Sequence, residues 1–333
     1  MDKKRILSGM RPSGKLHVGH YFGALKNWVQ FQHEYDSFHA IVDWHAMTSE
    51  YEDPKNIEND TLEMAADWIA AGLDPEKCTI FVQSNVPEHT ELHLMLSMIT
   101  PLPRLERIPT YKEQLREVTT RNLHTYGFLG YPVLQAADIL IYKAHLVPVG
   151  QDQVSHIEFT RELAKRFNSL YKEIFPVPDF KLTKTPILPG TDGRKMSKSY
   201  GNSIFLSDPP DVVMEKVRNT FSNPERARRS DPGDPEKCNV FHLHKIFTDS
   251  ENIARIDREC RTAEIGCVDC KKILGKKIIE FLEPVQERRL DITKDRDKLN
   301  EILGEGANKA RNLANQTMKD VKEAIGLKNF KAK

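Results

Sequence analysis

Four short runs rich in β-branched and aromatic residues alternate with longer helical patterns in the first half of the chain. The runs cover residues 5–8, 38–42, 79–82 and 145–149. Between them, residues 21–31 and 57–71 carry apolar side chains at three- and four-residue spacing, and the second pattern ends at Gly72. Strands that alternate with helices in this way predict a doubly wound parallel α/β sheet. Ligands bind beyond the carboxyl ends of the strands in such a sheet, so we expect a site among the residues that follow each strand.

The residues after the first run form the first of two motifs. Residues 12–20 read Pro-Ser-Gly-Lys-Leu-His-Val-Gly-His and lead into the helical pattern at Tyr21. A strand, a turn and a helix start predict a phosphate-binding turn, because free backbone N–H groups and the helix dipole favour an anion there. His17 and His20 stand three residues apart and share one helical face. Such a pair alone is more typical of surface or core histidines than of a site.

The second motif lies near the middle of the chain. Residues 193–199 read Gly-Arg-Lys-Met-Ser-Lys-Ser and place three cations among small residues. This composition indicates a mobile basic loop that suits a polyphosphate, although a solvated basic turn has the same composition. The two motifs together, in this order, resemble the two signature motifs of class I aminoacyl-tRNA synthetases.

Polar side chains on one helix face form the next candidate site. Tyr131, Gln135 and Asp138 stand at positions i, i+4 and i+7 of a helical pattern, and four apolar residues follow Asp138. A buried acid needs a hydrogen-bond donor, and a ligand, a helix cap and an internal hydrogen bond are alternatives here. The last strand run leads into a polar helix start at Gly150, Gln151, Asp152 and Gln153. Asp152 either caps this helix or reaches a ribose hydroxyl.

Four of the five cysteines crowd into one segment with the spacing Cys-x21-Cys-x6-Cys-x2-Cys. A closing Cys-x-x-Cys pair with two further thiols predicts a four-sulfur site, for which zinc and an iron–sulfur cluster are alternatives. The fifth, Cys78, is interpreted as a small buried residue. The predicted metal ligands are Cys238, Cys260, Cys267 and Cys270.

Composition adds limits to these expectations. The 333 residues suffice for about two domains, and a net charge of +1 means that a nucleic-acid surface must come from local clustering. We expect a nucleotide-binding domain over residues 1–205, interrupted by a helical insertion at about 85–126, and a helical domain over 206–333. No apolar stretch reaches bilayer length, so a cytoplasmic location without membrane contact is expected.

Over nearly its whole length the sequence resembles the bacterial tryptophanyl-tRNA synthetases. Besides the two motifs, Leu7-Ser8-Gly9 stands before the first, and Val-Asp-Trp-His-Ala follows the second strand run. Tyrosyl enzymes usually carry a tyrosine where this chain has Leu7, which favours tryptophan as substrate. The resemblance implies that tryptophan contacts Leu7, Tyr131, Gln135, Asp138 and Gln153, with Asp138 accepting the indole N–H. It implies an ATP site at Arg11, Pro12, Ser13, Gly19, His20, Gly150, Gln151, Asp152, Lys195, Met196, Ser197, Lys198 and Ser199.

The same resemblance implies the reaction. Tryptophan would react with ATP and Mg²⁺ to give the adenylate, which would then acylate tRNA(Trp), with His17, His20, Lys195 and Lys198 as the catalytic groups. It further implies a homodimer, tRNA anticodon binding by the helical domain, and a [4Fe-4S] cluster rather than Zn²⁺ at the four cysteines. A tyrosine–tRNA ligase, a nucleotidyltransferase without tRNA and a non-catalytic paralogue are the alternatives.

Overall fold

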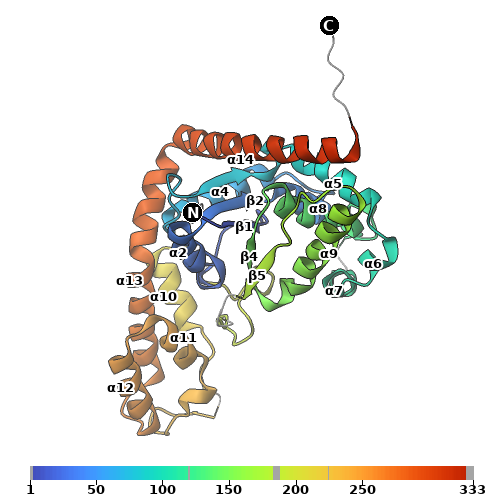
Figure 1. Ribbon diagram of the computed structural model, residues 1–333. Helices are drawn as coiled ribbons and strands as arrows, with labels where there is room; N and C mark the ends of the chain where they lie inside the picture. Colours follow the sequence, from blue (N-terminus) through green and yellow to red (C-terminus); the bar gives the residue numbers. More distant parts are fainter. Residues whose placement is uncertain (1–2, 119–120, 183–187, 224, 328–333) are drawn as a thin grey trace.

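A five-stranded parallel sheet with helices on both faces forms the larger part of the molecule (Figure 1). The computed structural model describes residues 3–118, 121–182, 188–223 and 225–327. The strand order is β3-β2-β1-β4-β5, and every neighbouring pair is parallel. This confirms the predicted doubly wound fold. The strands are β1 (Arg5–Met10), β2 (Asp36–Ile41), β3 (Thr79–Val82), β4 (Leu146–Val149) and β5 (Asp179–Leu182).

The strand β5 was not predicted. It reads Asp-Phe-Lys-Leu and is largely exposed at the edge of the sheet, so it lacks the apolar run that marks a buried strand. The other four strands match the predicted runs within two residues at either end. Local composition therefore identifies the four largely buried strands, β3 at one edge included, and misses the exposed edge strand β5.

Two apolar cores lie on opposite faces of the sheet. One core contains Trp28, Met64 and Trp68 from helices on one face, and the other contains Phe128, Phe159 and Phe167 from helices on the opposite face. The first predicted helix begins earlier than expected and is interrupted by a π-helical turn at Tyr21–Leu25. The helices that cover the sheet are α1 (Val18–His20), α2 (Lys26–Glu34), α3 (Asp43–Glu50), α4 (Ile57–Ala70), α8 (Tyr126–Ile141) and α9 (Val154–Leu170).

The predicted helical insertion contains α5 (Glu88–Met98), α6 (Leu102–Glu106) and α7 (Pro109–Glu117). Helix α5 packs along α8 and so joins the insertion to the sheet. The insertion lies on the right side of the molecule in Figure 1.

The chain after the sheet is helical, as expected, but its last helix does not stay with the others. Helix α14 crosses the upper edge of the sheet in Figure 1 and packs on β3, where a Cβ at Gly306 would lie 1.8 Å from the Ile80 oxygen. Only glycine, which has no Cβ, allows the helix to come this close. Helix α14 thereby covers β3 at the end of the sheet, where the strand would otherwise present an open edge. These helices are α10 (Pro210–Arg218), α11 (Asn239–Phe247), α12 (Ser250–Arg261), α13 (Cys267–Lys294) and α14 (Arg296–Ile325).

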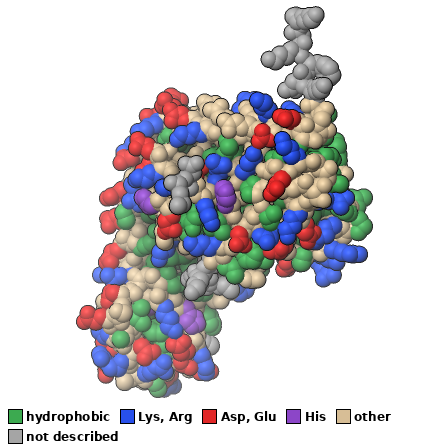
Figure 2. Space-filling model, viewed as in Figure 1, with side chains coloured by type: hydrophobic (Ala, Val, Ile, Leu, Met, Phe, Trp, Pro, Cys, Tyr) green, Lys and Arg blue, Asp and Glu red, His purple; other side chains and the backbone are tan. Residues whose placement is uncertain are grey.

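Acidic and basic side chains are interspersed over the face seen in Figure 2, in keeping with the net charge of +1. Within the described residues, no helix is both long enough and apolar enough to cross a membrane.

Candidate active site

A cavity of about 390 Å³ opens at the carboxyl ends of β1, β2 and β4. This is where a parallel sheet places its ligands, and the volume lies within the range of small-molecule sites. Helices α3, α7, α8 and α9 supply the remaining walls. Seven predicted site residues line the cavity: Leu7, Arg11, Tyr131, Gln135, Asp138, Gly150 and Gln153.

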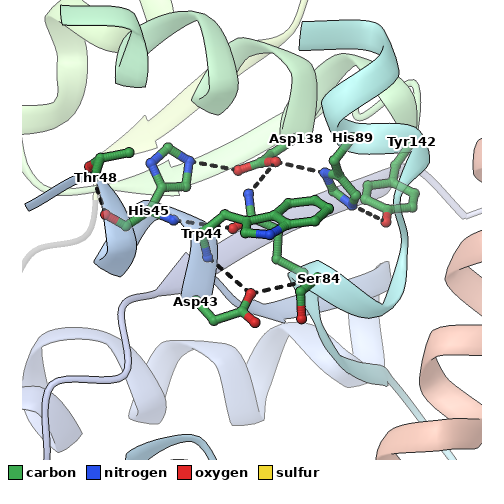
Figure 3. A network of polar contacts seen from close by, with 9 residues as sticks. Asp43, Trp44, His45, Thr48, Ser84, His89, Asp138 and Tyr142 are labelled. Carbon is green, nitrogen blue, oxygen red and sulfur yellow. Dashed lines mark hydrogen bonds and ion pairs between the residues drawn. The ribbon is translucent and has the colours of Figure 1, made fainter. Parts of the chain in front are cut away.

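Asp138 is the centre of a buried hydrogen-bond network at the base of this cavity (Figure 3). The side chain of Asp138 is 5% exposed. Its Oδ1 accepts hydrogen bonds from Gln83 Nε2 at 2.7 Å and from His89 Nδ1 at 2.6 Å, and its Oδ2 accepts one from His45 Nε2 at 2.9 Å. The residue lies inside α8, so it is not a helix cap. An internal network, one of the two structural alternatives, is therefore present.

The network sets the charge of Asp138. Burial opposes its ionisation, but the hydrogen bonds from His45 and His89 outweigh burial and lower its pKa to about 2. An ionised carboxylate only accepts hydrogen bonds, so His89 Nδ1 is the donor. On its other side, His89 Nε2 lies 2.6 Å from the Tyr142 hydroxyl. A carboxylate offers about four acceptor positions, and the described side chains occupy three at Asp138.

A second set of polar groups also lines the cavity. The Tyr131 hydroxyl is 3.0 Å from Thr110 Oγ1 and 3.3 Å from His156 Nε2. Burial raises the pKa of Tyr131 and, with the charge of His45, lowers the pKa of His156 to about 4. Both groups are therefore neutral at pH 7 and present hydrogen-bonding atoms rather than charges.

The two signature segments lie side by side. Lys198 Nζ donates to the backbone oxygens of Ser13 at 2.7 Å and Gly14 at 2.9 Å. Backbone hydrogen bonds from Val18 to Ile204 and from Leu206 to Leu16 join the first segment to the residues after the second. The tertiary structure thus brings together motifs separated by about half of the chain.

The two histidines of the first segment are stacked, with ring centroids 3.7 Å apart. Burial, together with the charge of Lys198, lowers the pKa of His17 to about 4, and burial with the charges of His17 and Lys198 lowers the pKa of His20 to about 3. A Cβ at Gly19 would lie 2.8 Å from the His17 ring, which explains the glycine between them. At pH 7 both rings are neutral hydrogen-bonding groups.

A side chain just outside the second signature segment binds the backbone of that segment. Asn202 is 2% exposed; its Oδ1 accepts from the Ser197 backbone N–H at 2.8 Å, and its Nδ2 donates to Asp192 at 2.7 Å. Met196 is buried, whereas Lys195 and Ser199 are exposed. The loop is therefore anchored at its base and presents its polar groups to solvent.

The predicted ribose side of the site is partly exposed. Gly150 and Gln153 line the cavity, and Gln153 Nε2 donates to Asp152 at 2.9 Å. Asp152 does not cap α9, because it lies inside the preceding 3-10 turn Gln151–Gln153. A Cβ at Gly150 would lie 2.7 Å from Asp152 Oδ1, so a larger residue there would displace the Asp152 side chain.

The four predicted cysteine ligands meet near the amino-terminal end of α13. Arg226 Nη1 lies 3.9 Å from both Cys260 Sγ and Cys267 Sγ. Burial, followed by the three neighbouring thiols, raises the pKa of Cys270 to about 12. In the described part of the chain, no group of three or more His, Cys, Asp or Glu side chains has the geometry of a metal site. Cys78, in contrast, is buried alone, as predicted.

Four important residues were not predicted from the sequence: Gln83, His89, Tyr142 and Asn202. Gln83 follows the last residue of β3, so the rule that ligands bind beyond strand ends would have identified it. His89 acts through a contact with Asp138, 49 residues away, so no local pattern marks it. Asn202 lies only five residues after Ser197, which it binds, but it falls outside the motif.

Comparison with known proteins agrees with this geometry. The family model of class I tRNA synthetases for W and Y matches residues 2–283. The tryptophan–tRNA ligase of Thermotoga maritima is 51% identical, with 97% of this chain and 99% of that protein covered. That of Aquifex aeolicus is 44% identical, with 97% and 100% covered.

Solved structures show the same relation. The tryptophanyl-tRNA synthetase of Campylobacter jejuni complexed with ADP and tryptophan has a TM-score of 0.89 and 34% identity, and the match covers 97% of this chain and all of that chain. A tyrosyl-tRNA synthetase from Archaeoglobus fulgidus, at 22% identity and a TM-score of 0.65, shares the fold. The parallel sheet, the cavity at its carboxyl edge and these full-length similarities together show that the chain belongs to the class I tRNA synthetases for tryptophan and tyrosine, and within them to the tryptophan–tRNA ligases.

Proposed function

We propose that the cavity of this ligase holds the indole ring of tryptophan against Asp138, and that the two signature segments hold ATP. The observation that carries this proposal is the state of Asp138: a buried, ionised acceptor with one acceptor position left beside the cavity. An indole N–H is a donor without acceptor capacity, so it suits a carboxylate that only accepts. Leu7 supplies an apolar wall without a hydroxyl for a phenol.

The other predicted contacts follow from the same placement. Tyr131 and Gln153 offer neutral oxygen acceptors for the amino group of the substrate, and Arg11 and Gln135 line the cavity beside them. The ATP contacts are assigned to the first signature segment, the 150–152 turn and the basic loop: Pro12, Ser13, Gly19, His20, Gly150, Gln151, Asp152, Lys195, Met196, Ser197, Lys198 and Ser199.

In the first step the tryptophan carboxylate attacks the α-phosphate of ATP, a P–O bond forms, and pyrophosphate leaves. Positioning and charge stabilisation dominate such a transfer. Lys195 and Lys198 supply protein cations, and Mg²⁺ when bound neutralises phosphate charge. His17 and His20 are neutral, so we assign them hydrogen bonds to the nucleotide rather than ion pairs. In the second step a terminal ribose hydroxyl of tRNA(Trp) attacks the adenylate and AMP leaves.

Amino-acid-dependent exchange of pyrophosphate into ATP tests this assignment. Tryptophan should support exchange, whereas tyrosine and phenylalanine should not. The tryptophan analogue with sulfur in place of the indole N–H should lose about 10- to 100-fold in kcat/KM. Its ring has no N–H to fill the remaining acceptor position of Asp138. Equal use of the sulfur analogue and tryptophan would contradict the role of Asp138.

We further propose that Cys238, Cys260, Cys267 and Cys270 hold a [4Fe-4S] cluster and that the helical domain, residues 206–333, contacts the tRNA. Two observations support this proposal: the four thiols neighbour one another, and the Arg226 guanidinium beside two of them suits an anionic centre. Protein purified without oxygen should be brown and contain about four iron atoms per chain. One zinc per colourless chain would instead support the alternative.

A second copy of the chain is the proposed partner of the insertion. Leu94, Met98, Leu102 and Tyr126 are between 55% and 73% exposed on α5, α6 and α8. Exposed apolar clusters mark association surfaces. Met98→Asp should convert a dimer to a monomer in sedimentation, whereas a dimer that persists would place the interface elsewhere. For the location we propose the cytoplasm, where tRNA charging and reduced cysteines belong.

A further inference from the structure

A buried acid on α4 links the first signature segment to a helix from the other end of the chain. The side chain of Asp67 is 1% exposed. Its Oδ2 accepts the backbone N–H of Leu16 at 3.1 Å, and its Oδ1 accepts from Arg289 Nε of α13 at 2.7 Å. Arg289 also pairs with Glu63, one turn earlier on α4. One carboxylate thus joins the turn of residues 12–20, helix α4 and helix α13.

This contact fixes the peptide at the centre of the turn. The Leu16 N–H is held by Asp67, and the Leu16 oxygen accepts from the Leu206 N–H at 2.9 Å. Both polar ends of the segment around Leu16 are therefore engaged by parts of the chain that lie far away in sequence. A buried carboxylate that loses its cation is left uncompensated, so the Leu16 contact depends on Arg289.

The same acid also acts on the second signature segment. The charges of Asp60 and Asp67 favour the cationic form of Lys198, although burial lowers the pKa of that lysine. Lys198 in turn donates to the backbone oxygens of Ser13 and Gly14, which precede Leu16 by three and two residues. Helix α4 therefore carries acids behind both segments that we assign to ATP.

Helix α13 carries this contact over a long distance. It contains 28 residues, or about 42 Å at the rise of an α-helix, and runs along the left side of Figure 1. The helix begins at Cys267, and Arg289 lies near its other end. The residue before Arg289 offers a natural comparison. Arg288 donates to the Ala70 oxygen at 2.7 Å, so it also joins α13 to α4 but makes no contact with the turn.

We propose that Asp67 and Arg289 are positioning residues for ATP: the docked helix α13 orients the Leu16 peptide and thereby the nucleotide-binding turn. Arg288 is, on this account, a structural latch between the same two helices. The inference rests on the proposed ATP site at this turn and goes beyond it, because it makes nucleotide binding depend on a helix of the tRNA-binding part of the chain.

The experiment compares Arg289→Met with Arg288→Met in the full-length protein. Arg289→Met removes the ion pairs with Asp67 and Glu63, and Arg288→Met removes the hydrogen bond to the Ala70 oxygen, so both weaken the docking of α13 on α4. A purely structural role therefore predicts that any change in kinetics follows the loss in Tm and affects both substrates alike. We expect Arg289→Met to raise the KM for ATP about tenfold or more in pyrophosphate exchange, within the range typical of coupling between sites. The KM for tryptophan should change less than about twofold, because the Asp138 network is untouched. Arg288→Met should leave both KM values near those of the wild type.

Two further variants separate positioning from folding. Asp67→Asn should resemble Arg289→Met, and the double variant should be no worse than either, because the two side chains act as one unit. Arg289→Lys, the variant that best preserves the fold, should retain part of the ATP affinity, since an ammonium group satisfies one acid but not both. Glu63→Gln should have a smaller effect than Asp67→Asn, because it leaves the charged Asp67 paired with Arg289 and bound to the Leu16 N–H.

Two results would overturn the inference. One is an equal rise in the KM for ATP in the Arg288 and Arg289 variants, and the other is a parallel rise in both substrate KM values in the Arg289 variant. These results differ from a failure of the proposed function. If the wild-type protein shows no tryptophan-dependent exchange, the function itself is wrong, whereas normal exchange with unchanged Arg289 variants rejects only the positioning role.

Discussion

The proposed amino-acid side and the proposed nucleotide side of the site are built differently. Around Asp138 the polar groups are buried, and the carboxylate is held by three side-chain donors. Around the signature segments, the basic loop presents Lys195 and Ser199 to solvent, and Lys198 is bound to backbone oxygens of the turn. The first arrangement is ready for a ligand, whereas the second is held by contacts that phosphate oxygens can replace.

This difference matches what each side has to do. Selecting an indole requires a fixed acceptor in a site from which water is excluded, because an unpaired buried group is costly. Stabilising pyrophosphate requires cations already placed where negative charge develops. A lysine that exchanges its backbone oxygens for phosphate oxygens when ATP binds can supply such a cation. We therefore expect changes in the network to alter substrate choice and changes in the loop to alter rate.

The largest effect is expected at Lys198. Lys198→Ala should lower the rate of adenylate formation by about 10²- to 10³-fold, as is typical when one transition-state donor is removed. Tryptophan binding at equilibrium should change little, because Lys198 does not line the cavity. Stopped-flow and equilibrium binding measure the two quantities. Arg194→Ala is a matched control, since Arg194 is in the same loop but is paired with Asp192. Weaker tryptophan binding at a normal rate would contradict this assignment.

The next effect is expected at Asp138. Asp138→Asn keeps the shape of the side chain but replaces one carboxylate oxygen with an N–H₂ donor. This donor would face the side-chain donors that now bind the carboxylate. The kcat/KM for tryptophan should fall by about 10- to 100-fold, the range for a lost hydrogen bond to a charged group. The KM for ATP should stay within about twofold. Steady-state exchange at varied tryptophan and ATP measures both, and unchanged tryptophan kinetics would exclude Asp138 as a ligand.

A smaller effect is expected at His89, which contacts Asp138 but is not among the residues that line the cavity. Asparagine carries its amide nitrogen on Cγ, as histidine carries Nδ1, so His89→Asn preserves the donor and His89→Leu does not. Both variants leave the Tyr142 hydroxyl without its ring partner, so their difference isolates the hydrogen bond to Asp138. We expect the KM for tryptophan to be about fivefold higher in the leucine variant, in line with roughly 1 kcal/mol for one hydrogen bond. Equal KM values would assign His89 a packing role only.

The smallest effect concerns stability and pH. The pKa of His20 falls from 6.5 to about 3 on folding, chiefly through burial and then through the charges of His17 and Lys198. Below pH 6.5 the unfolded chain therefore binds a proton that the folded chain does not, and stability is lost as the pH falls from about 6.5 towards 3. His20→Asn, which keeps an acceptor for the His17 N–H, should lose about 1 kcal/mol less than the wild type between pH 7.5 and 5.5. Urea unfolding at the two pH values measures the difference.

The pH dependence also separates the two sides. The pKa of Asp138 falls from 3.8 to about 2 because hydrogen bonds outweigh burial. Its contribution to stability is complete above pH 3.8 and is lost as the pH falls towards 2. Loss of stability at pH 5.5 in the wild type that vanishes in Asp138→Asn would therefore contradict this assignment of charges.

The sequence by itself determined the class of fold, four of the five strands, and the residues of both signature segments. These features are local: strand and helix periodicities are carried by neighbouring residues, and the motifs carry their own chemistry. It also identified seven residues that line the cavity. Five of them follow from one helix face and one strand end, which meet at a common edge of the sheet, whereas Leu7 and Arg11 were named only through the family resemblance.

The tertiary structure alone decided how these parts act together. Gln83 and His89 donate to Asp138 from 55 and 49 residues away. The Tyr142 hydroxyl contacts Asp138 only indirectly, through the His89 ring. Arg289 reaches Asp67 across 222 positions, and Gly306 brings α14 onto β3. Neither the charge of a buried acid nor the partner of a buried arginine follows from its neighbours in sequence, because both depend on which distant groups replace the water lost on burial.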